Sequence, residues 1–310
     1  MPMIKFSVLI PAYKRDYLSE AINSVVCQSY TNFELIIVDD CSPEDLQVIV
    51  EEFHDERIRY YRNSKNCGAI DVVNNWNICL SYATGDYVIC MGDDDKLLPN
   101  CLEEYARLIE KHPNLGVYHG WTQIIDENSK VTDITAPRPE FETVLSLLYF
   151  RICGRQQYIG DFLFNKELLV GNNGFYYIPL AWGSDDISAY IAASRSGIAN
   201  TQIPVFQYRI NSLTISKSGN MSLQMRGLIN SIHWIKDFIS DYIPKNELDI
   251  LYMEMINKRL DKYEKERKTG TIYKDLYNQN LLRIFFWFRN RKKYSVSTKE
   301  ILKALLYYFM

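Results

Sequence analysis

The residues best suited to chemistry in this 310-residue chain are carboxylates gathered in short clusters. Asp39 and Asp40 follow one apolar run, and Asp93, Asp94 and Asp95 follow another. Adjacent carboxylates repel one another and destabilise a fold unless a cation neutralises them. Mg²⁺ and Mn²⁺ prefer carboxylate oxygen and share their sites with diphosphates. The triple cluster therefore predicts a site for a divalent metal and a diphosphate, with a solvated turn and helix cap as the alternative.

A third pair of carboxylates, Asp185 and Asp186, lies at the start of a helical pattern. A carboxylate within hydrogen-bond reach of a hydroxyl group can act as a general base and typically contributes about 10²–10⁴-fold to a rate. The alternative is an acidic first turn, which the helix dipole stabilises without any catalytic role. The residues alone favour this structural interpretation.

The elements that must position these acids alternate between strand and helix over the first 120 residues. The strand runs lack polar alternation, which indicates strands buried on both faces, as in a parallel sheet covered by helices. Apolar residues at helical spacing lie between them. The pattern predicts a doubly wound, mainly parallel α/β domain, whose ligands bind at the carboxyl ends of the strands. The expected strands are 6–10, 35–38, 58–61 and 87–91, and the expected helices begin near 18, 46, 72 and 99.

Beyond Gly120 the pattern is looser, with strands expected at 162–164 and 205–210 and a helix at 187–193. From about Leu223 onward the chain is predicted to be helical. We therefore expect one domain over 1–220 with two halves, 1–120 and 121–220. A helical, basic appendage is expected over 221–310.

Several classes of nucleotide-binding protein are disfavoured by missing motifs. No G-x-G-x-x-G or Walker sequence follows the first strand, which argues against dinucleotide enzymes and P-loop NTPases. The segment after that strand, Pro11 to Arg15, is not the glycine-rich basic loop of a nucleotidyltransferase. A diphosphate would have to be held through metal instead.

An ordered set of motifs lies within roughly residues 4–215. The motifs are Ser7-Val8-Leu9-Ile10-Pro11-Ala12-Tyr13, residues 21–30, Phe33-Glu34-Leu35-Ile36-Ile37-Val38-Asp39-Asp40, and Gly85-Asp86-Tyr87-Val88 leading to Asp93-Asp94-Asp95. This set resembles family 2 glycosyltransferases. The resemblance implies the GT-A fold and inverting transfer of a sugar from a nucleotide donor, as in bacterial polysaccharide synthesis. It also implies that the domain over 1–220 is a catalytic domain with a nucleotide-binding half (1–120) and an acceptor-binding half (121–220).

The resemblance implies roles on the donor side. Tyr13, in the motif with Pro11, resembles the residue that stacks on the nucleotide base. Asp40 resembles the acid that hydrogen-bonds the base, usually uracil, with Asp39 beside it. Asp93 matches the acid on the ribose side.

For the metal, a Mn²⁺ or Mg²⁺ ion, the resemblance implies Asp94 as the ligand, with Asp93 and Asp95 in supporting positions. Two departures from the family pattern weaken the transfer. Gly92 stands where many relatives have Asp, and Val72-Val73-Asn74 lacks an arginine that could touch the donor phosphates.

For the acceptor side, the resemblance reverses the structural interpretation of the third pair. Asp185 becomes the expected base and Asp186 the alternative. Trp182 could shape the acceptor pocket, although a core tryptophan is equally compatible with its position. Arg209 resembles the residue that closes the donor site, where it would contact phosphate; a surface ion pair is the alternative.

The formal charge of −3 conceals an asymmetry along the chain. Residues 256–310 hold fourteen Lys and Arg against five Asp and Glu, whereas residues 1–255 hold 21 against 33. The aromatic and basic segment 281–310 suits the surface of an anionic membrane. A lid on the catalytic domain or a homodimer contact is the alternative. The acidic remainder and the absence of a recognition motif argue against nucleic acid.

Seven cysteines, an odd number without a Cys-x-x-Cys pair, predict neither a disulfide framework nor a zinc site. Reduced, mostly buried thiols fit a cytoplasmic protein. The N-terminus lacks the layout of a signal peptide, and no run reaches the ~18 apolar residues of a membrane span. We therefore expect a cytoplasmic location, with peripheral contact at the inner face of the plasma membrane as an extension.

Together these features predict an inverting, metal-dependent hexosyltransferase that uses a nucleotide-sugar donor, with UDP expected, and a glycan or lipid-linked acceptor. A non-catalytic nucleotide-sugar-binding scaffold in a polysaccharide-assembly complex is the alternative.

Overall fold

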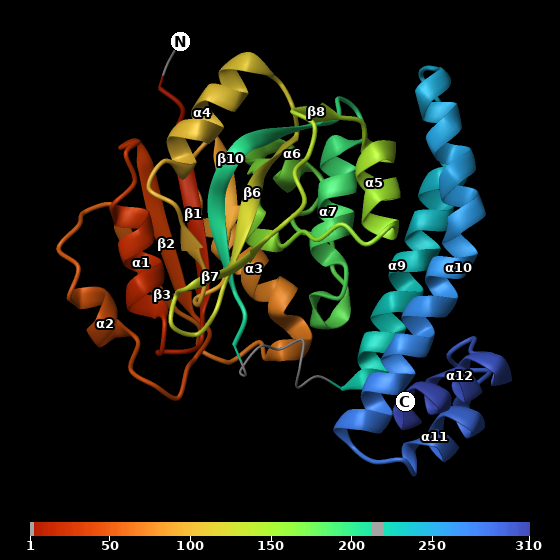
Figure 1. Cartoon of the computed structure of the whole chain (residues 1–310). Coiled ribbons are helices and arrows are strands. Elements are labelled where there is room, and N and C mark those ends of the chain that lie inside the picture. The colour runs from red at the N-terminus through yellow and green to blue at the C-terminus, as the bar shows by residue number, and fades with distance from the viewer. Residues whose placement is uncertain (1–2, 212–219) are drawn as a thin grey trace.

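The computed structural model describes residues 3–211 and 220–310. Its first half is a parallel sheet in the order β3-β2-β1-β4, in which β1, β2 and β4 are mainly apolar and β3 carries Arg59 and Arg62 (Figure 1). All of β2 and nearly all of β1 are buried, which matches the predicted double-sided coverage. The strands are β1 (Phe6–Ala12), β2 (Phe33–Asp39), β3 (Ile58–Arg62) and β4 (Tyr87–Cys90).

The second half continues the same sheet through β9, β6 and β10. Strand β9 (Phe162–Asn165) is antiparallel to both β4 and β6, whereas β10 (Ile198–Arg209) is parallel to β6 (Val117–Ile125). The sheet is therefore mixed, and its parallel part is the half that was expected to bind nucleotide. Short pairings at the margins involve β5 (Lys96–Leu97), β7 (Val131–Ile134) and β8 (Phe141–Glu142).

Helices cover both faces of the sheet, which confirms the doubly wound prediction (Figure 1). Each face has its own apolar core, because alternate strand residues such as Val8 and Leu9 point to opposite sides. One core contains α1 (Leu18–Val26), α2 (Gln47–Glu51) and α4 (Cys101–Lys111). The other contains α3 (Val72–Tyr82), α5 (Val144–Ile152), α6 (Lys166–Gly171) and α7 (Ser184–Ala193).

The C-terminal region is helical in the described residues from Met221 onward. Helices α9 and α10 form a long pair beside α5 and α7, and Ile235 and Ile256 join the core of that face (Figure 1). At the far end of the pair, α11 and α12 build a separate core around Trp287. The helices are α9 (Met221–Asp241), α10 (Glu247–Asn278), α11 (Arg283–Asn290) and α12 (Thr298–Phe309).

The seven cysteines are free, but the prediction that most are buried is wrong. Cys79, Cys90 and Cys101 are buried, whereas Cys27 and Cys153 are exposed. Burial raises the pKa of Cys79 well above its ordinary value, so this thiol stays protonated. Among the described helices, none combines the length and apolarity needed to cross a bilayer.

Candidate active site

A cavity of about 620 Å³ opens where β1 and β4 end, at the carboxyl edge of the parallel half of the sheet. It brings together most of the residues predicted from the sequence, although these come from segments up to 174 positions apart. This is the edge where an open α/β sheet binds ligands. The predicted residues that line the cavity are Pro11, Tyr13, Asp40, Asp93, Asp94, Asp95, Trp182 and Asp185.

Asp93 ties the acidic turn after β4 to the segment after β1. Its Oδ2 accepts the backbone N–H groups of Tyr13 and Lys14, both at 2.7 Å. Burial and the neighbouring charge of Asp94 raise the pKa of Asp93 to about 6, against the lowering effect of those N–H groups. The contact fixes the backbone of Tyr13, whose side chain is partly exposed beside the cavity.

Asp95 is buried and braces the turn from within. Its two oxygens accept the backbone N–H groups of Arg209, at 3.0 Å, and of Gly92, at 3.3 Å. Burial, followed by the charge of Asp94, raises the pKa of Asp95 well above its ordinary value. Asp95 therefore serves to shape the turn.

Asp94 is held differently, because its Oδ2 accepts the side-chain N–H of Asn211 at 2.8 Å. Its Oδ1 lies over Gly92, where an added Cβ atom would stand only 2.8 Å away. The same Cβ would lie 3.0 Å from Asp95 Oδ2. Any side chain at position 92 would thus displace these carboxylates, so the turn in this conformation suits glycine.

A metal held by all three acids is not preformed in the described part of the chain. No three Asp, Glu, His or Cys residues in 3–211 and 220–310 lie together as a metal-binding group. Both oxygens of Asp95 and Oδ2 of Asp93 accept backbone N–H groups, whereas Asp94 accepts only a side-chain N–H among the described contacts. Asp94 is therefore the carboxylate of the three that is least tied to the turn. Mg²⁺ commonly takes one or two carboxylates and completes its shell with substrate phosphates. The turn fits that kind of metal site.

Arg209 does not line the cavity, although the sequence suggested a phosphate contact. Its side chain is fully buried behind the acidic turn and lies over the ring of Tyr17, 4.1 Å from the ring centroid. Nε donates to the backbone carbonyl of Asp94 at 2.7 Å, Nη1 to the carbonyl of Asp126 at 3.0 Å and Nη2 to Glu20 at 3.0 Å. Arg209 therefore holds the turn from the side away from the cavity.

The two acids after β2 also separate in role. Asp39 is fully buried, where it accepts hydrogen bonds from Tyr60 and Arg62, and it does not line the cavity. Asp40 lines the cavity and accepts hydrogen bonds from the Asn63 side chain at 2.9 Å and the Cys67 backbone at 2.9 Å. Asp40 thus faces the cavity, and Asp39 lies behind it.

Asp185 and Asp186 lie in the first turn of α7, which begins at Ser184 after Gly183, whose φ of +105° is a backbone conformation that favours glycine. Asp185 lines the main cavity, and burial together with the charge of Asp186 raises its pKa to about 7. Asp186 is instead bound by Arg151 and Gln157. A carboxyl group that titrates near neutrality is suited to taking a proton.

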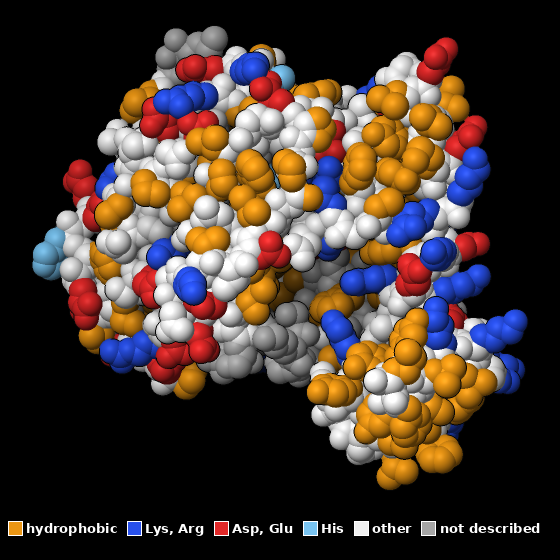
Figure 2. Space-filling model, viewed as in Figure 1, with side chains coloured by type: hydrophobic (Ala, Val, Ile, Leu, Met, Phe, Trp, Pro, Cys, Tyr) orange, Lys and Arg blue, Asp and Glu red, His pale blue; other side chains and the backbone are white. Residues whose placement is uncertain are grey.

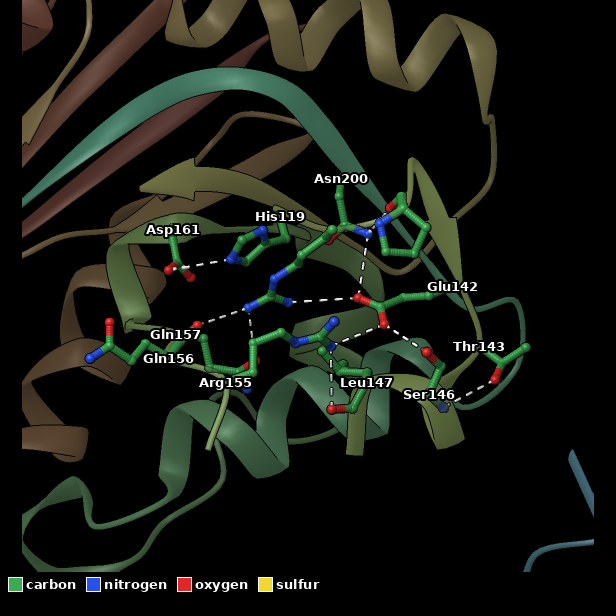
Figure 3. A network of polar contacts seen from close by, with 12 residues as sticks. His119, Glu142, Thr143, Ser146, Leu147, Arg155, Gln156, Gln157, Asp161 and Asn200 are labelled. Carbon is green, nitrogen blue, oxygen red and sulfur yellow. Dashed lines mark hydrogen bonds and ion pairs between the residues drawn. The ribbon is translucent and has the colours of Figure 1, made fainter. Parts of the chain in front are cut away.

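A buried polar network supports this part of the site (Figure 3). Glu142 accepts hydrogen bonds from Arg155 at 3.0 Å and from Ser146 at 2.9 Å. At the other end, Asp161 lies 3.3 Å from His119 and accepts the backbone N–H of Tyr158 at 3.0 Å. The network thereby fixes the loop that carries Gln157, the partner of Asp186, and Tyr158.

The cavity wall also contains residues that were not predicted as site residues, among them Tyr158, Tyr208 and Gln224. Tyr158 and Tyr208 stack with their ring centroids 3.7 Å apart, and both line the cavity. Gln224, from α9 of the C-terminal region, is almost completely buried in the wall, and its Oε1 accepts no hydrogen bond from the described residues. Tyr208 directly precedes the predicted residue Arg209 in the sequence, whereas no sequence signal marks Gln224.

Part of the chain matches a known protein family and several known proteins. The family model described as glycosyl transferase family 2 matches residues 7–165, about half of the chain. The chain is 33% identical over 133 residues to the Escherichia coli protein UDP-Glc:alpha-D-GlcNAc-diphosphoundecaprenol beta-1,3-glucosyltransferase WfgD. That match covers 43% of this chain and 51% of WfgD. The chain therefore matches about half the length of that relative.

A second relative is the Staphylococcus aureus poly(ribitol-phosphate) beta-N-acetylglucosaminyltransferase TarS, 32% identical over 120 residues, which cover 36% of this chain and 20% of TarS. The crystal structure of TarS 1–349 in complex with UDP-GlcNAc superposes with a TM-score of 0.57 at 18% identity. The superposition covers 89% of this chain and 92% of the TarS chain. This structural likeness confirms the predicted GT-A fold. With the family match extending from β1 through the acidic turn to β9, this chain belongs to glycosyl transferase family 2.

Proposed function

We propose that the protein is an inverting glycosyltransferase that moves a hexose or N-acetylhexosamine from a UDP-linked donor. The acceptor is a glycan or a lipid-linked saccharide, and the reaction belongs to bacterial cell-surface polysaccharide synthesis. The names of WfgD and TarS, a glucosyltransferase that uses UDP-Glc and an N-acetylglucosaminyltransferase, support this class of donor and product.

The observation that carries the proposal is one cavity with acids of two different kinds in its wall. Asp94 belongs to the turn after β4, and Asp185 belongs to the start of α7. The first kind suits a diphosphate and its metal, and the second suits a hydroxyl group that must lose a proton. Sugar transfer from a nucleotide needs both in one cavity.

On the donor side, Tyr13 would stack on the nucleotide base, and Pro11 would border it. Asp40 would accept a hydrogen bond from the base, because a carboxylate has about four acceptor sites and only part of this capacity is used by its neighbours. Asp39 would act from behind by fixing the end of β2. Asp93 would face the ribose while its Oδ2 holds the backbone of Tyr13.

A Mn²⁺ or Mg²⁺ ion would be held by Asp94 together with the donor diphosphate, with Asp93 and Asp95 shaping the turn. When bound, such a metal stabilises negative charge on the departing diphosphate. Asn211 fixes one oxygen of Asp94, and Arg209 fixes the Asp94 backbone. These contacts orient the carboxylate in advance, so no reorganisation is needed during the reaction.

On the acceptor side, Asp185 would remove the proton from the attacking hydroxyl group as the bond to the anomeric carbon forms. Its neighbour Asp186 is bound by Arg151 at 2.9 Å, and the charge of Asp186 contributes to the raised pKa of Asp185. Trp182 would form part of the acceptor wall, since it lines the cavity and apolar ring faces suit sugars.

The proposal places the protein in the cytoplasm, with peripheral contact at the inner face of the plasma membrane through residues 281–310, where a lipid-linked acceptor would be available. A homodimer contact through the same residues is the competing arrangement.

The test is incubation of the protein with a panel of sugar nucleotides and Mn²⁺, followed by detection of hydrolysis or transfer. We expect turnover of one or more UDP-sugars and its loss in Asp94→Ala, with an unchanged circular dichroism spectrum. Full activity in that variant would refute the metal assignment. Specific donor binding without any turnover by the wild type would instead favour the non-catalytic scaffold.

A further inference from the structure

The unit formed by α11 and α12 exposes large apolar side chains at the end of the molecule. Figure 2 shows hydrophobic side chains crowded over this unit, at the lower right of the view. Soluble monomers rarely leave large contiguous apolar patches uncovered, and such patches mark contacts with proteins or membranes. The exposed residues are Leu282, Phe285, Leu302, Leu306, Phe309 and Met310.

The geometry of α12 gathers these side chains into a stripe. Leu302, Leu306 and Phe309 are spaced by four and three residues, so they share one face of the helix. Leu306 is 64% exposed and Phe309 69% exposed, although both are residue types that favour burial. Phe285 on α11 is 68% exposed. Burial of these exposed side chains would therefore require a surface that the described residues do not provide.

The stripe belongs to a folded unit with its own core. Trp287 is fully buried, and its indole N–H donates to Asp275 at 2.7 Å. A capping box between Ser297 and Glu300 begins α12. The apolar residues are therefore presented at fixed positions on short, anchored helices.

The charge of this unit has one sign. Residues 281–310 contain seven Lys and Arg but only one acid, Glu300, which is buried and occupied by the capping box. Lys299 and Lys303 lie on α12 three residues before Leu302 and Leu306 and are exposed beside the stripe. Each such cation is attracted to the negative surface of an anionic bilayer. A second copy of the same positive unit would repel it instead.

The unit also lies at the same end of the molecule as the carboxyl edge of the parallel strands (Figure 1). Its core includes Met221 and Met225 from the start of α9, and Trp182 of the cavity wall packs against it. A surface that engages α11 and α12 would consequently lie on the side of the molecule where the cavity opens.

We infer that α11 and α12 dock on the surface of an anionic lipid bilayer, with Leu282, Phe285, Leu306 and Phe309 entering the interface. The two helices have 8 and 12 residues, too short for the roughly 20 residues of a membrane span, so they would lie in the plane of the surface. The basic side chains would contact phosphate head groups around the apolar patch. This docking requires no particular donor or acceptor.

The test is co-sedimentation of the full chain with vesicles of phosphatidylcholine alone or with 30% phosphatidylglycerol added. We expect binding to the anionic vesicles that weakens as salt is raised, because exposed charges are screened. The variant Phe285→Ser/Leu306→Ser/Phe309→Ser should lose at least tenfold in partition coefficient. Its matched control, Ile243→Ser/Leu248→Ser/Leu251→Ser, changes exposed apolar residues near the opposite end of the α9–α10 pair and should bind as the wild type does.

Thermal unfolding should show that both triple variants are folded, and their donor turnover in solution should match the wild type. Equal vesicle binding by the two variants would overturn the inference. The inference would also be overturned if neither protein binds vesicles and the wild type is a dimer that the first triple variant dissociates. The apolar face would then be an interface between two copies of the chain. If neither the wild type nor any variant turns over a donor, the proposed reaction is contradicted, but the vesicle-binding result still tests the docking.

Discussion

Arg151 donates through Nε to both carboxylate oxygens of Asp186, at 3.0 and 2.9 Å, and thereby distinguishes two adjacent acids. Gln157 adds a hydrogen bond to Asp186 at 2.6 Å. Asp185 lines the main cavity instead, and its pKa rises to about 7 through burial and the charge of Asp186. The pair therefore divides into Asp186, which is held by Arg151 and Gln157, and Asp185, which faces the cavity and titrates near neutrality.

The pH dependence of transfer follows from this division. A base must be deprotonated to act, so kcat/KM should rise about tenfold per pH unit up to about pH 7 and level off above it. Asp186→Asn removes a charge that raises the pKa of Asp185, so its profile should shift to lower pH while activity persists. Profiles of kcat/KM for both proteins measure this shift. Complete inactivity of Asp186→Asn at every pH would instead identify Asp186 as the base.

The structure predicts that Arg209 supports the acidic turn without contacting phosphate. Arg209→Met removes hydrogen bonds to the Asp94 carbonyl and to Glu20, and it should lower the free energy of unfolding by about 2–4 kcal/mol. Urea unfolding measures this loss, and titration calorimetry with UDP measures donor affinity. If the variant has unchanged stability but binds UDP tenfold more weakly, the result would support the phosphate contact suggested by the sequence.

Gln224 should affect the acceptor more than the donor, because α9 carries it beside Trp182. An added Cβ at Gly227, one turn further along the helix, would lie 2.8 Å from Trp182 Cβ. Gln224→Leu removes an unpartnered buried acceptor and should lower kcat/KM for the acceptor about tenfold, the effect of one hydrogen bond of roughly 1.4 kcal/mol. Donor hydrolysis should be unaffected. Asn230→Leu, on the exposed side of the same helix, is the matched control, and identical kinetics for the two variants would contradict the assignment.

Stability in acid should depend on Glu34, a buried residue of β2. Burial alone would raise its pKa, but hydrogen bonds from Ser7, from Thr84 and from Arg59 hold the pKa at about 2. A lowered pKa contributes stability that is present above the ordinary value of 4.5 and is lost as the pH falls toward 2.

Glu34→Gln should remove up to about 3 kcal/mol of this pH dependence. Urea unfolding of both proteins at pH 7, 4 and 3 measures it. Parallel curves for the two proteins over this range would show that Glu34 is not the group responsible.

The sequence was sufficient to predict the acidic strand ends and the parallel arrangement of strands that brings these acids together. Apolar runs such as Leu35 to Val38 define buried strands, and the carboxyl edge of a parallel sheet is a general binding site. Local pattern could not decide which acids face the cavity. Asp39 and Asp40 are adjacent, and only the partners contributed by Tyr60, Arg62 and Asn63 show that Asp39 is turned inward.

Long-range partners also explain what sequence reasoning missed. Arg209 resembles a phosphate-binding arginine, but its guanidinium donates a hydrogen bond to Glu20, 189 residues away, and lies behind the acidic turn. Gln224 belongs to no motif and reaches the cavity only because α9 packs on the segment before α7. Such contacts depend on tertiary packing, which periodicity and motif spacing do not specify.

The account depends most on Asp185 as the base within a donor-binding cavity, and one paired measurement tests it. Donor affinity and transfer rate are measured for the wild type and Asp185→Asn with the UDP-sugar that the wild type turns over. We predict equal affinity, within about twofold, and a transfer rate lower by about 10²–10⁴-fold. A variant that transfers sugar at the wild-type rate would contradict the account.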